Sequence, residues 1–217
     1  PNNPTGAIAD VAFYQRAVEF CAAHNILLAS DNPYCDVTFE GYKAPSALQA
    51  PDAKAHAVEF MSFSKTHNMA GWRIGAAVGN ADALRILLKV KSNIDSGHFI
   101  SVYDAAVEAL ENTSQSWIDW RNAIYQARRD RILAALPEMG LAADKPLGSL
   151  YIWAKPHKLD GATYVEEALE YAHVSLAPGG AYGPGGSDYV RISVGMSDER
   201  IDEAIARMKK WYSEKHG

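Results

Sequence analysis

The segment SFSKTHNMAGWRIG, residues 62–75, constrains this chain more than any other part of the sequence. It lies between an apolar stretch and a glycine-flanked turn, so we expect it to connect two strands of a sheet. Lys65 carries an amine that can condense with an aldehyde. Ser62, Ser64 and Arg73 carry groups that can hold a phosphate. Pyridoxal phosphate is a phosphorylated aldehyde and satisfies both requirements.

Residues 1–100 alternate between helical and strand patterns, which indicates an α/β fold. We expect a helix capped by Asp10 that ends near residue 24, followed by strands at 26–29, 58–63 and 73–78. The continuous apolar run at 26–29 is typical of a strand buried on both faces of a parallel sheet. Open α/β sheets place ligands at the carboxyl ends of their strands. Asp31 and Lys65 are therefore expected at such ends.

Residues 101–217 have a different texture, with longer helices and fewer strands. We expect helices at 101–111 and from about 114 to Pro137, the second with a buried face formed by Trp117, Trp120, Ile124 and Ala127. Strands are expected at 150–154, 174–177 and 189–194, and a last helix after Ser197. The chain is therefore predicted to divide into an α/β domain, 1–100, and a small α+β domain, 101–217.

Composition excludes several classes of protein. The formal net charge is −5, and the absence of a long basic run argues against binding to nucleic acid. The apolar stretches are too short to cross a bilayer, so we expect no membrane association. Cys21 and Cys35 are expected to be reduced residues of a cytoplasmic protein. The histidines lack the spacing of metal ligands, so no metal site is predicted.

Four motifs share their order with one known family. PNNPTG at residues 1–6, DNPY at 31–34, the Lys65 segment and YVRIS at 189–193 resemble the conserved elements of class I/II aminotransferases, the aspartate aminotransferase-like enzymes of fold type I. The resemblance implies a partial pyridoxal phosphate-binding large domain of α/β type followed by the small domain. It also implies a homodimer that acts on an amino acid and a 2-oxo acid.

The resemblance assigns a role to each residue of the cofactor site. Lys65 forms the aldimine with pyridoxal phosphate and then carries the proton at the substrate α-carbon. Asp31 faces the pyridine nitrogen and keeps it protonated. The remaining ligands are Tyr34 and Asn3 at the phenolic oxygen, and Ser62, Ser64 and Arg73 at the phosphate.

Arg191 is the expected anchor of the substrate carboxylate, together with Asn3. It alternates with Val190 and Ile192 and so points away from the face that those two bury. The glycine- and proline-rich stretch 178–186 is expected to form a mobile loop over this arginine. Tyr151 and Trp153 are interpreted as core residues.

Three functions remain open at this point. The first is amino-group transfer, and residues 41–43 and 89–97 most resemble the LL-diaminopimelate aminotransferase group. The second is β-elimination by a lyase with the same motifs. The third is ligand sensing by the aminotransferase-like domain of a transcription regulator.

The chain begins with Pro1, inside a motif, and the family it resembles is about twice as long. We therefore expect a C-terminal portion of a longer protein. The rest would supply the glycine-rich phosphate turn and the ring that stacks on the cofactor. This polypeptide by itself is expected to bind the cofactor weakly and to turn over slowly.

Overall fold

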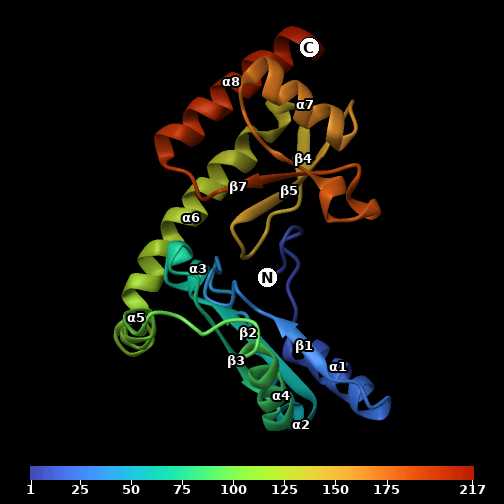
Figure 1. The fold of residues 1–217 in the computed structure, drawn as a ribbon. Coiled ribbons are helices and arrows are strands. Elements are labelled where there is room, and N and C mark those ends of the chain that lie inside the picture. The colour runs from blue at the N-terminus through green and yellow to red at the C-terminus, as the bar shows by residue number, and fades with distance from the viewer. The chain divides into compact units, whose positions relative to one another are not determined.

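The computed structural model describes all 217 residues, and their contacts form two compact units (Figure 1). The first unit contains Pro1 and residues 8–119, and the second contains residues 2–7 and 120–217. The helix at 100–112 belongs to the first unit because Ala106 is buried against Phe63 and Ile74. The sequence-based division after residue 100 places that helix in the second domain, and as a division into domains it stays a prediction.

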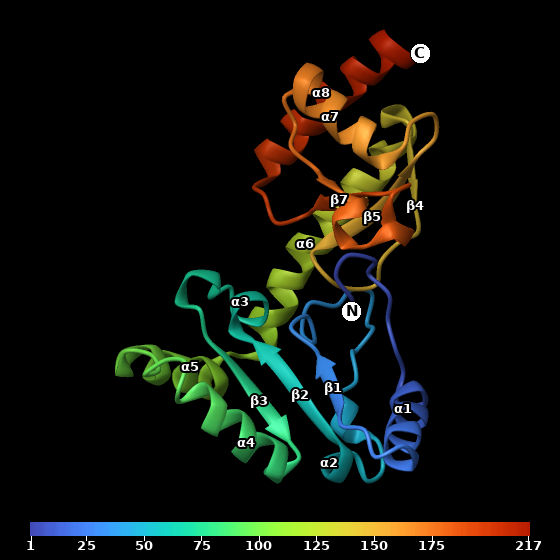
Figure 2. The same cartoon turned by 45° about the vertical axis from the view of Figure 1, so that its right-hand side comes forward.

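The first unit is built on a three-stranded sheet in the order β1-β2-β3. β1 (Leu28–Asp31) is parallel to β2 (Ala57–Ser62), and β2 is antiparallel to β3 (Gly75–Gly79). Figure 2 shows the strands side by side, with a short helix directly after β2. The helices and turns of this unit are α1 (Val11–Ala23), η1 (Ala47–Gln49), α2 (Ala53–His56), α3 (Phe63–Thr66), η2 (Ala70–Trp72), α4 (Ala81–Lys91) and α5 (Ile100–Asn112).

The start of the first helix follows from its sequence. Asp10 accepts a hydrogen bond from the backbone N–H of Phe13 at 2.7 Å, which satisfies one of the free donors of the first turn. Asn25 follows the helix with φ 54°, the left-handed conformation that often ends helices. Val18 and Cys21 are the buried residues of α1. The predicted helix is confirmed.

The first strand differs from its prediction in place and in burial. It occupies residues 28–31 rather than 26–29, and Ile26 and Leu27 are both 48% exposed. The strand pairs only with β2, so it lies at an edge of this sheet. An apolar run cannot distinguish a central strand from an edge strand whose outer residues stay exposed. The expectation of burial on both faces is therefore wrong for this structure.

The second unit is built on a four-stranded antiparallel sheet in the order β4-β5-β7-β6. Its strands are β4 (Leu141–Ala143), β5 (Tyr151–Pro156), β6 (Ala177–Pro178) and β7 (Val190–Ser193), and its helices and turns are α6 (Gln115–Ala135, from residue 120 on), η3 (Leu136–Met139), α7 (Gly161–Ala172), η4 (Gly179–Tyr182), η5 (Pro184–Gly186) and α8 (Asp198–His216). The strand expected at 174–177 is reduced to two residues.

One face of this sheet forms the core of the second unit. Ile152, Ala154, Val190 and Ile192 pack against α6, α7 and α8, which Figures 1 and 2 show on the same side of the sheet. Side chains alternate between the faces of a strand, so Tyr151, Trp153 and Arg191 lie on the opposite face. Their partial burial agrees with this. The interpretation of Tyr151 and Trp153 as core residues is therefore wrong.

The buried face of α6 also differs from its prediction. Trp120 is 60% exposed, whereas Arg121, Arg129, Ile132 and Ala135 are buried. Arg129 is completely buried because its charge is compensated: Nη1 donates to the carbonyl of Pro146 at 2.7 Å and Nη2 pairs with Asp130 at 2.7 Å. An apolar pattern cannot reveal a buried face that contains satisfied arginines.

None of the helices combines the length and apolar character needed to cross a membrane.

Replacing Ile152 by alanine tests the core of the second unit. Ile152 has no exposed surface, so the change should lower the free energy of unfolding by about 2–5 kcal/mol. Lys155→Ala on the same strand is the control. Its side chain is 54% exposed and pairs with an exposed Asp188, so its loss should cost less than about 1 kcal/mol. Urea denaturation monitored by circular dichroism measures both, and equal losses would contradict the assignment of the core face.

Candidate active site

The parallel pairing of β1 and β2 brings Asp31 and Ser62 to one edge of the first sheet. Asp31 pairs with Phe60, so β2 extends two residues further, to Ser62. β3 runs in the opposite direction and starts opposite Ser62, at Gly75. The segment 62–75 therefore leaves the sheet and returns to it at the same edge. The predicted connection between two strands is confirmed.

The short helix α3 begins at the end of β2 and contains Ser64 and Lys65. Ser62 is its N-cap and accepts a hydrogen bond from the backbone N–H of Ser64 at 3.2 Å. Thr66 donates its hydroxyl to the carbonyl of Ser62 at 2.9 Å. These bonds fix the first turn, so Lys65 projects from a defined backbone, and its side chain is partly buried.

Arg73 returns the chain to the sheet through an unusual conformation. Its φ is 54°, in the left-handed region, and its carbonyl accepts a hydrogen bond from Nε2 of His98 at 2.7 Å. Nη1 donates to the carbonyl of Ala70 at 2.9 Å. An exposed guanidinium with one such bond retains further N–H donors, and strain of this kind is common at functional sites.

Asp31 ends β1 and is exposed, whereas Tyr34, three residues later, is only 4% exposed. The backbone N–H of Asn32 still donates to the carbonyl of Phe60 at 2.9 Å, so the direction of the chain is fixed just beyond Asp31. One edge of the first sheet thus carries a carboxylate, an amine, two hydroxyls and a guanidinium. Those groups fit a phosphorylated pyridine aldehyde.

Asn3 and Arg191 both belong to the second unit. Nη1 of Arg191 donates to Oδ1 of Asn3 at 2.9 Å. The guanidinium carbon lies 4.0 Å from the ring centre of Tyr151 and 4.9 Å from that of Tyr182. Tyr182 comes from the stretch 178–186, as expected for a loop next to this arginine, while the mobility of the loop stays a prediction.

Comparison with known proteins assigns the chain to a family. The family model described as "Aminotransferase class I and II" matches residues 1–208. This protein is a member of the class I and II aminotransferase family. It is 43% identical over 211 residues to an LL-diaminopimelate aminotransferase of Moorella thermoacetica and 42% identical over 210 residues to LL-diaminopimelate aminotransferase 2 of Trichormus variabilis. The alignments cover 97% and 96% of this chain but 54% of each relative.

Solved structures agree with this assignment to the aminotransferase family. Substrate-bound BacF from Bacillus subtilis superimposes with a TM-score of 0.91 at 38% identity, covering 97% of this chain and 54% of that one. A probable N-succinyldiaminopimelate aminotransferase from Thermus thermophilus gives 0.88 at 37% identity, covering 97% and 56%. The chain thus spans about half the length of the relatives it matches. Fold type I and the family cofactor, pyridoxal phosphate, are as the sequence predicts.

The sequence interpretation missed a buried carboxylate on β2, opposite the residue that precedes Asp31. Glu59 on β2 is 8% exposed and accepts hydrogen bonds from Ser30 Oγ at 3.1 Å, Ser46 Oγ at 2.7 Å and the backbone N–H of Ala47 at 2.8 Å. These three hydrogen bonds to Glu59 tie β1 and η1 to β2. Tyr14 lies next to this network: burial raises the pKa of Tyr14, and its hydrogen bond with Ser30 lowers it. A charged residue inside an apolar strand was the available signal.

Replacing Glu59 by alanine leaves three buried or partly buried donors without their acceptor. We expect a loss of about 2–4 kcal/mol in the free energy of unfolding. Glu19→Ala is the control, because Glu19 is exposed on α1 and accepts only from Gln15. Urea titration monitored by circular dichroism compares the two variants. A loss for Glu59→Ala no larger than that for Glu19→Ala would show that the network does not stabilise the sheet.

Cys35 should be almost unreactive in the folded chain. Burial, followed by the neighbouring carboxyl of Asp36, raises the pKa of the Cys35 thiol to about 12. The thiolate is the nucleophile, so near pH 8 only about one molecule in ten thousand is reactive. In a Cys21→Ser variant, iodoacetamide should label Cys35 slowly at pH 8 and faster as the pH rises. Mass spectrometry follows the rate, and labelling as fast in buffer as in urea would refute the shift.

Proposed function

We propose that this chain supplies the lysine-bearing part of a pyridoxal phosphate-dependent aminotransferase that moves an amino group between an amino acid and a 2-oxo acid. One observation carries the proposal. Asp31 lies at the same edge of the first sheet as the segment that carries Ser62, Ser64, Lys65 and Arg73. The family model matches residues 1–208, which include all five. Neither a lysine nor a carboxylate alone would support it.

The residues of the first unit hold the cofactor in this proposal. Lys65 binds it through its amine, and Asp31 pairs with the ring nitrogen. Tyr34 donates to the phenolic oxygen, a role that the family resemblance also gives to Asn3 of the second unit. When bound, pyridoxal phosphate stabilises negative charge at the substrate α-carbon. The phosphate ligands are Ser62, Ser64 and Arg73.

Two further steps are assigned to side chains of this chain. Once the substrate amine had displaced it from the cofactor, the free amine of Lys65 would move the proton at the α-carbon, since an amine on a short fixed helix can both accept and return it. Asn3 fixes the guanidinium of Arg191 by accepting a hydrogen bond from Nη1. The remaining N–H donors of Arg191 hold the substrate carboxylate. The half-buried arginine has no ion-pair partner, which supports a carboxylate ligand.

The proposed amino donor is LL-diaminopimelate. Support comes from relatives that carry the name LL-diaminopimelate aminotransferase and share 43% and 42% identity with this chain. A β-lyase would instead release pyruvate and ammonia from a β-substituted amino acid. Product analysis therefore separates the two reactions.

We also infer a homodimer that resides in the cytoplasm. The first unit exposes large apolar side chains, including Leu88 at 65%, Ile94 at 76% and Phe99 at 75%, and such surface is usually covered by a partner or by more of the same protein. Both cysteines are free thiols, as is usual in a reducing compartment.

Borohydride trapping tests the role of Lys65. The purified chain is incubated with pyridoxal phosphate, reduced, digested and analysed by mass spectrometry. We expect the phosphopyridoxyl mass on the peptide containing Lys65, at partial occupancy because the chain spans about half the length of its relatives. The label should vanish in Lys65→Ala and persist in Lys43→Ala, which removes an exposed lysine of the same unit. Equal labelling of Lys43 and Lys65 would disprove a specific site.

A further inference from the structure

Arg191 is surrounded by uncharged groups. Its guanidinium carbon lies over the rings of Tyr151 and Tyr182, and its Nη1 donates a hydrogen bond to Oδ1 of Asn3. No ion pair involves this arginine. A guanidinium on an aromatic face is attracted by the ring electrons, and the contact leaves its N–H edge free for a second partner.

Tyr182 reaches Arg191 from outside the sheet, whereas Tyr151 lies on the neighbouring strand β5. In the register of the sheet, Trp153 is directly opposite Arg191. The ring of Tyr182 meets the ring of Trp153 edge to face, with centres 5.9 Å apart and planes at 82°. Tyr189 stacks on the same tryptophan at 5.2 Å and 10°. Trp153 therefore contacts two residues of the loop between β6 and β7, Tyr182 within it and Tyr189 at its end.

The backbone of this loop is also fixed against Trp153. The N–H of Gly179 donates to the carbonyl of Tyr189 at 2.8 Å. A Cβ on Gly179 would lie 2.2 Å from the carbonyl oxygen of Gly186 and 2.7 Å from the ring of Trp153. Such contacts are far below van der Waals distance. The loop is closed on itself and on the indole, which places the η4 turn with Tyr182 beside the arginine.

We propose that Tyr182 is a positioning residue for Arg191 and that the contact with Trp153 holds the ring of Tyr182 in position. The aromatic ring of Tyr182, not its hydroxyl, holds the guanidinium plane so that the N–H edge is ready for a carboxylate. The consequence for binding rests on the proposed function, in which Arg191 holds the substrate carboxylate. The effect on the arginine itself does not.

The Nε–Hε resonance of Arg191 in proton–nitrogen NMR spectra of the full chain reads out this arrangement. An Arg191→Lys variant assigns the signal. The aromatic rings close to the guanidinium should move the chemical shift of the Hε proton away from the value typical of solvated arginines. Acetate, with chloride at the same ionic strength as reference, serves as the carboxylate probe.

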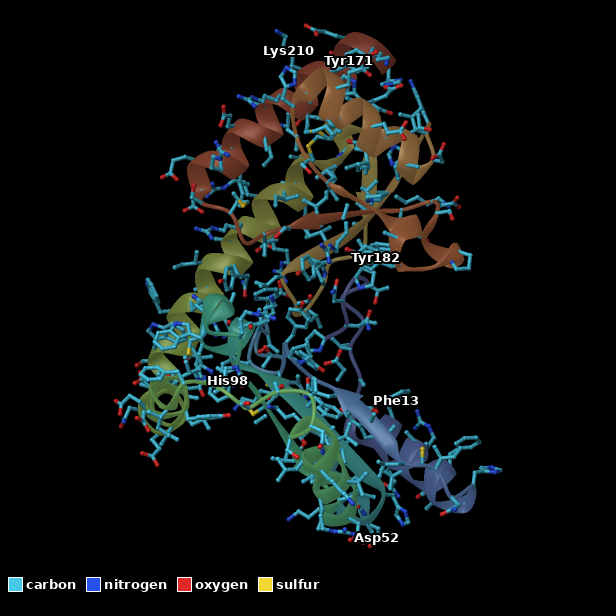
Figure 3. All side chains as sticks on the ribbon, viewed as in Figure 1. Phe13, Asp52, His98, Tyr171, Tyr182 and Lys210 are labelled. Atoms are coloured by element: carbon cyan, nitrogen blue, oxygen red, sulfur yellow. The ribbon has the colours of Figure 1, made fainter.

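Three variants separate the ring from other effects. Tyr182→Leu should return the signal toward the solvated position and raise the acetate dissociation constant about two- to five-fold, the factor equivalent to one exposed cation–π contact. Tyr182→Phe should leave both unchanged. Tyr171→Leu is the matched control, because Tyr171 is an exposed tyrosine with Lys215 over its ring at 3.9 Å. It lies at the far end of the second unit from Tyr182 (Figure 3).

Each result decides one point. If Tyr182→Leu keeps the other resonances of the second unit but leaves the Arg191 signal in place, Tyr182 does not position the arginine. Loss of the shift in Tyr182→Phe would assign the effect to the hydroxyl and overturn the proposal as stated. If acetate fails to move the signal of the unmodified chain, the carboxylate role of Arg191 is wrong, while the ligand-free shift still judges Tyr182.

Discussion

The parallel pairing of β1 with β2 is the constraint on which the site of the first unit depends. Only parallel strands end at the same edge of a sheet, and the register carries β2 two residues past Asp31. The carboxylate therefore lies at the edge from which the lysine helix begins. Glu59 stabilises this arrangement, because its carboxylate accepts hydrogen bonds from both β1 and η1. The site is thus held by the strand pairing and by one buried charge.

The second unit uses its sheet differently, by giving each face a separate task. The alternation of side chains sends Ile152 and Ile192 into a core with three helices, and it sends Trp153 and Arg191 to the other face. Ion pairs between α6 and α8, such as Arg128–Asp198 at 2.6 Å, lie on the outside of that core. The half-buried arginine contacts two aromatic rings and the side chain of Asn3 and has no acidic partner.

Much of this was predictable because the motifs are local. The Lys65 segment, the Asp10 cap and the alternation around Arg191 each depend on neighbours in sequence, and the structure has all three. The failures concern burial decided by distant partners. Arg129 is buried because the carbonyl of Pro146, which is distant in sequence, accepts a hydrogen bond from its guanidinium, and Asp130 is its ion-pair partner. The contact of Tyr182 with Arg191 also depends on a loop closure that no periodicity encodes.

The glycines of the loop between β6 and β7 differ in whether their surroundings leave room for a side chain, which decides where the sequence of that loop can vary. At 179 and 186 a methyl group would collide with the facing carbonyl oxygen, at 2.2 and 2.3 Å respectively. Gly185 has open space around it and an ordinary φ. A side chain is thus expected to be tolerated at Gly185 and not at Gly179 or Gly186. A stretch whose composition suggests only flexibility therefore also contains two glycines that the close approach of two backbone segments requires.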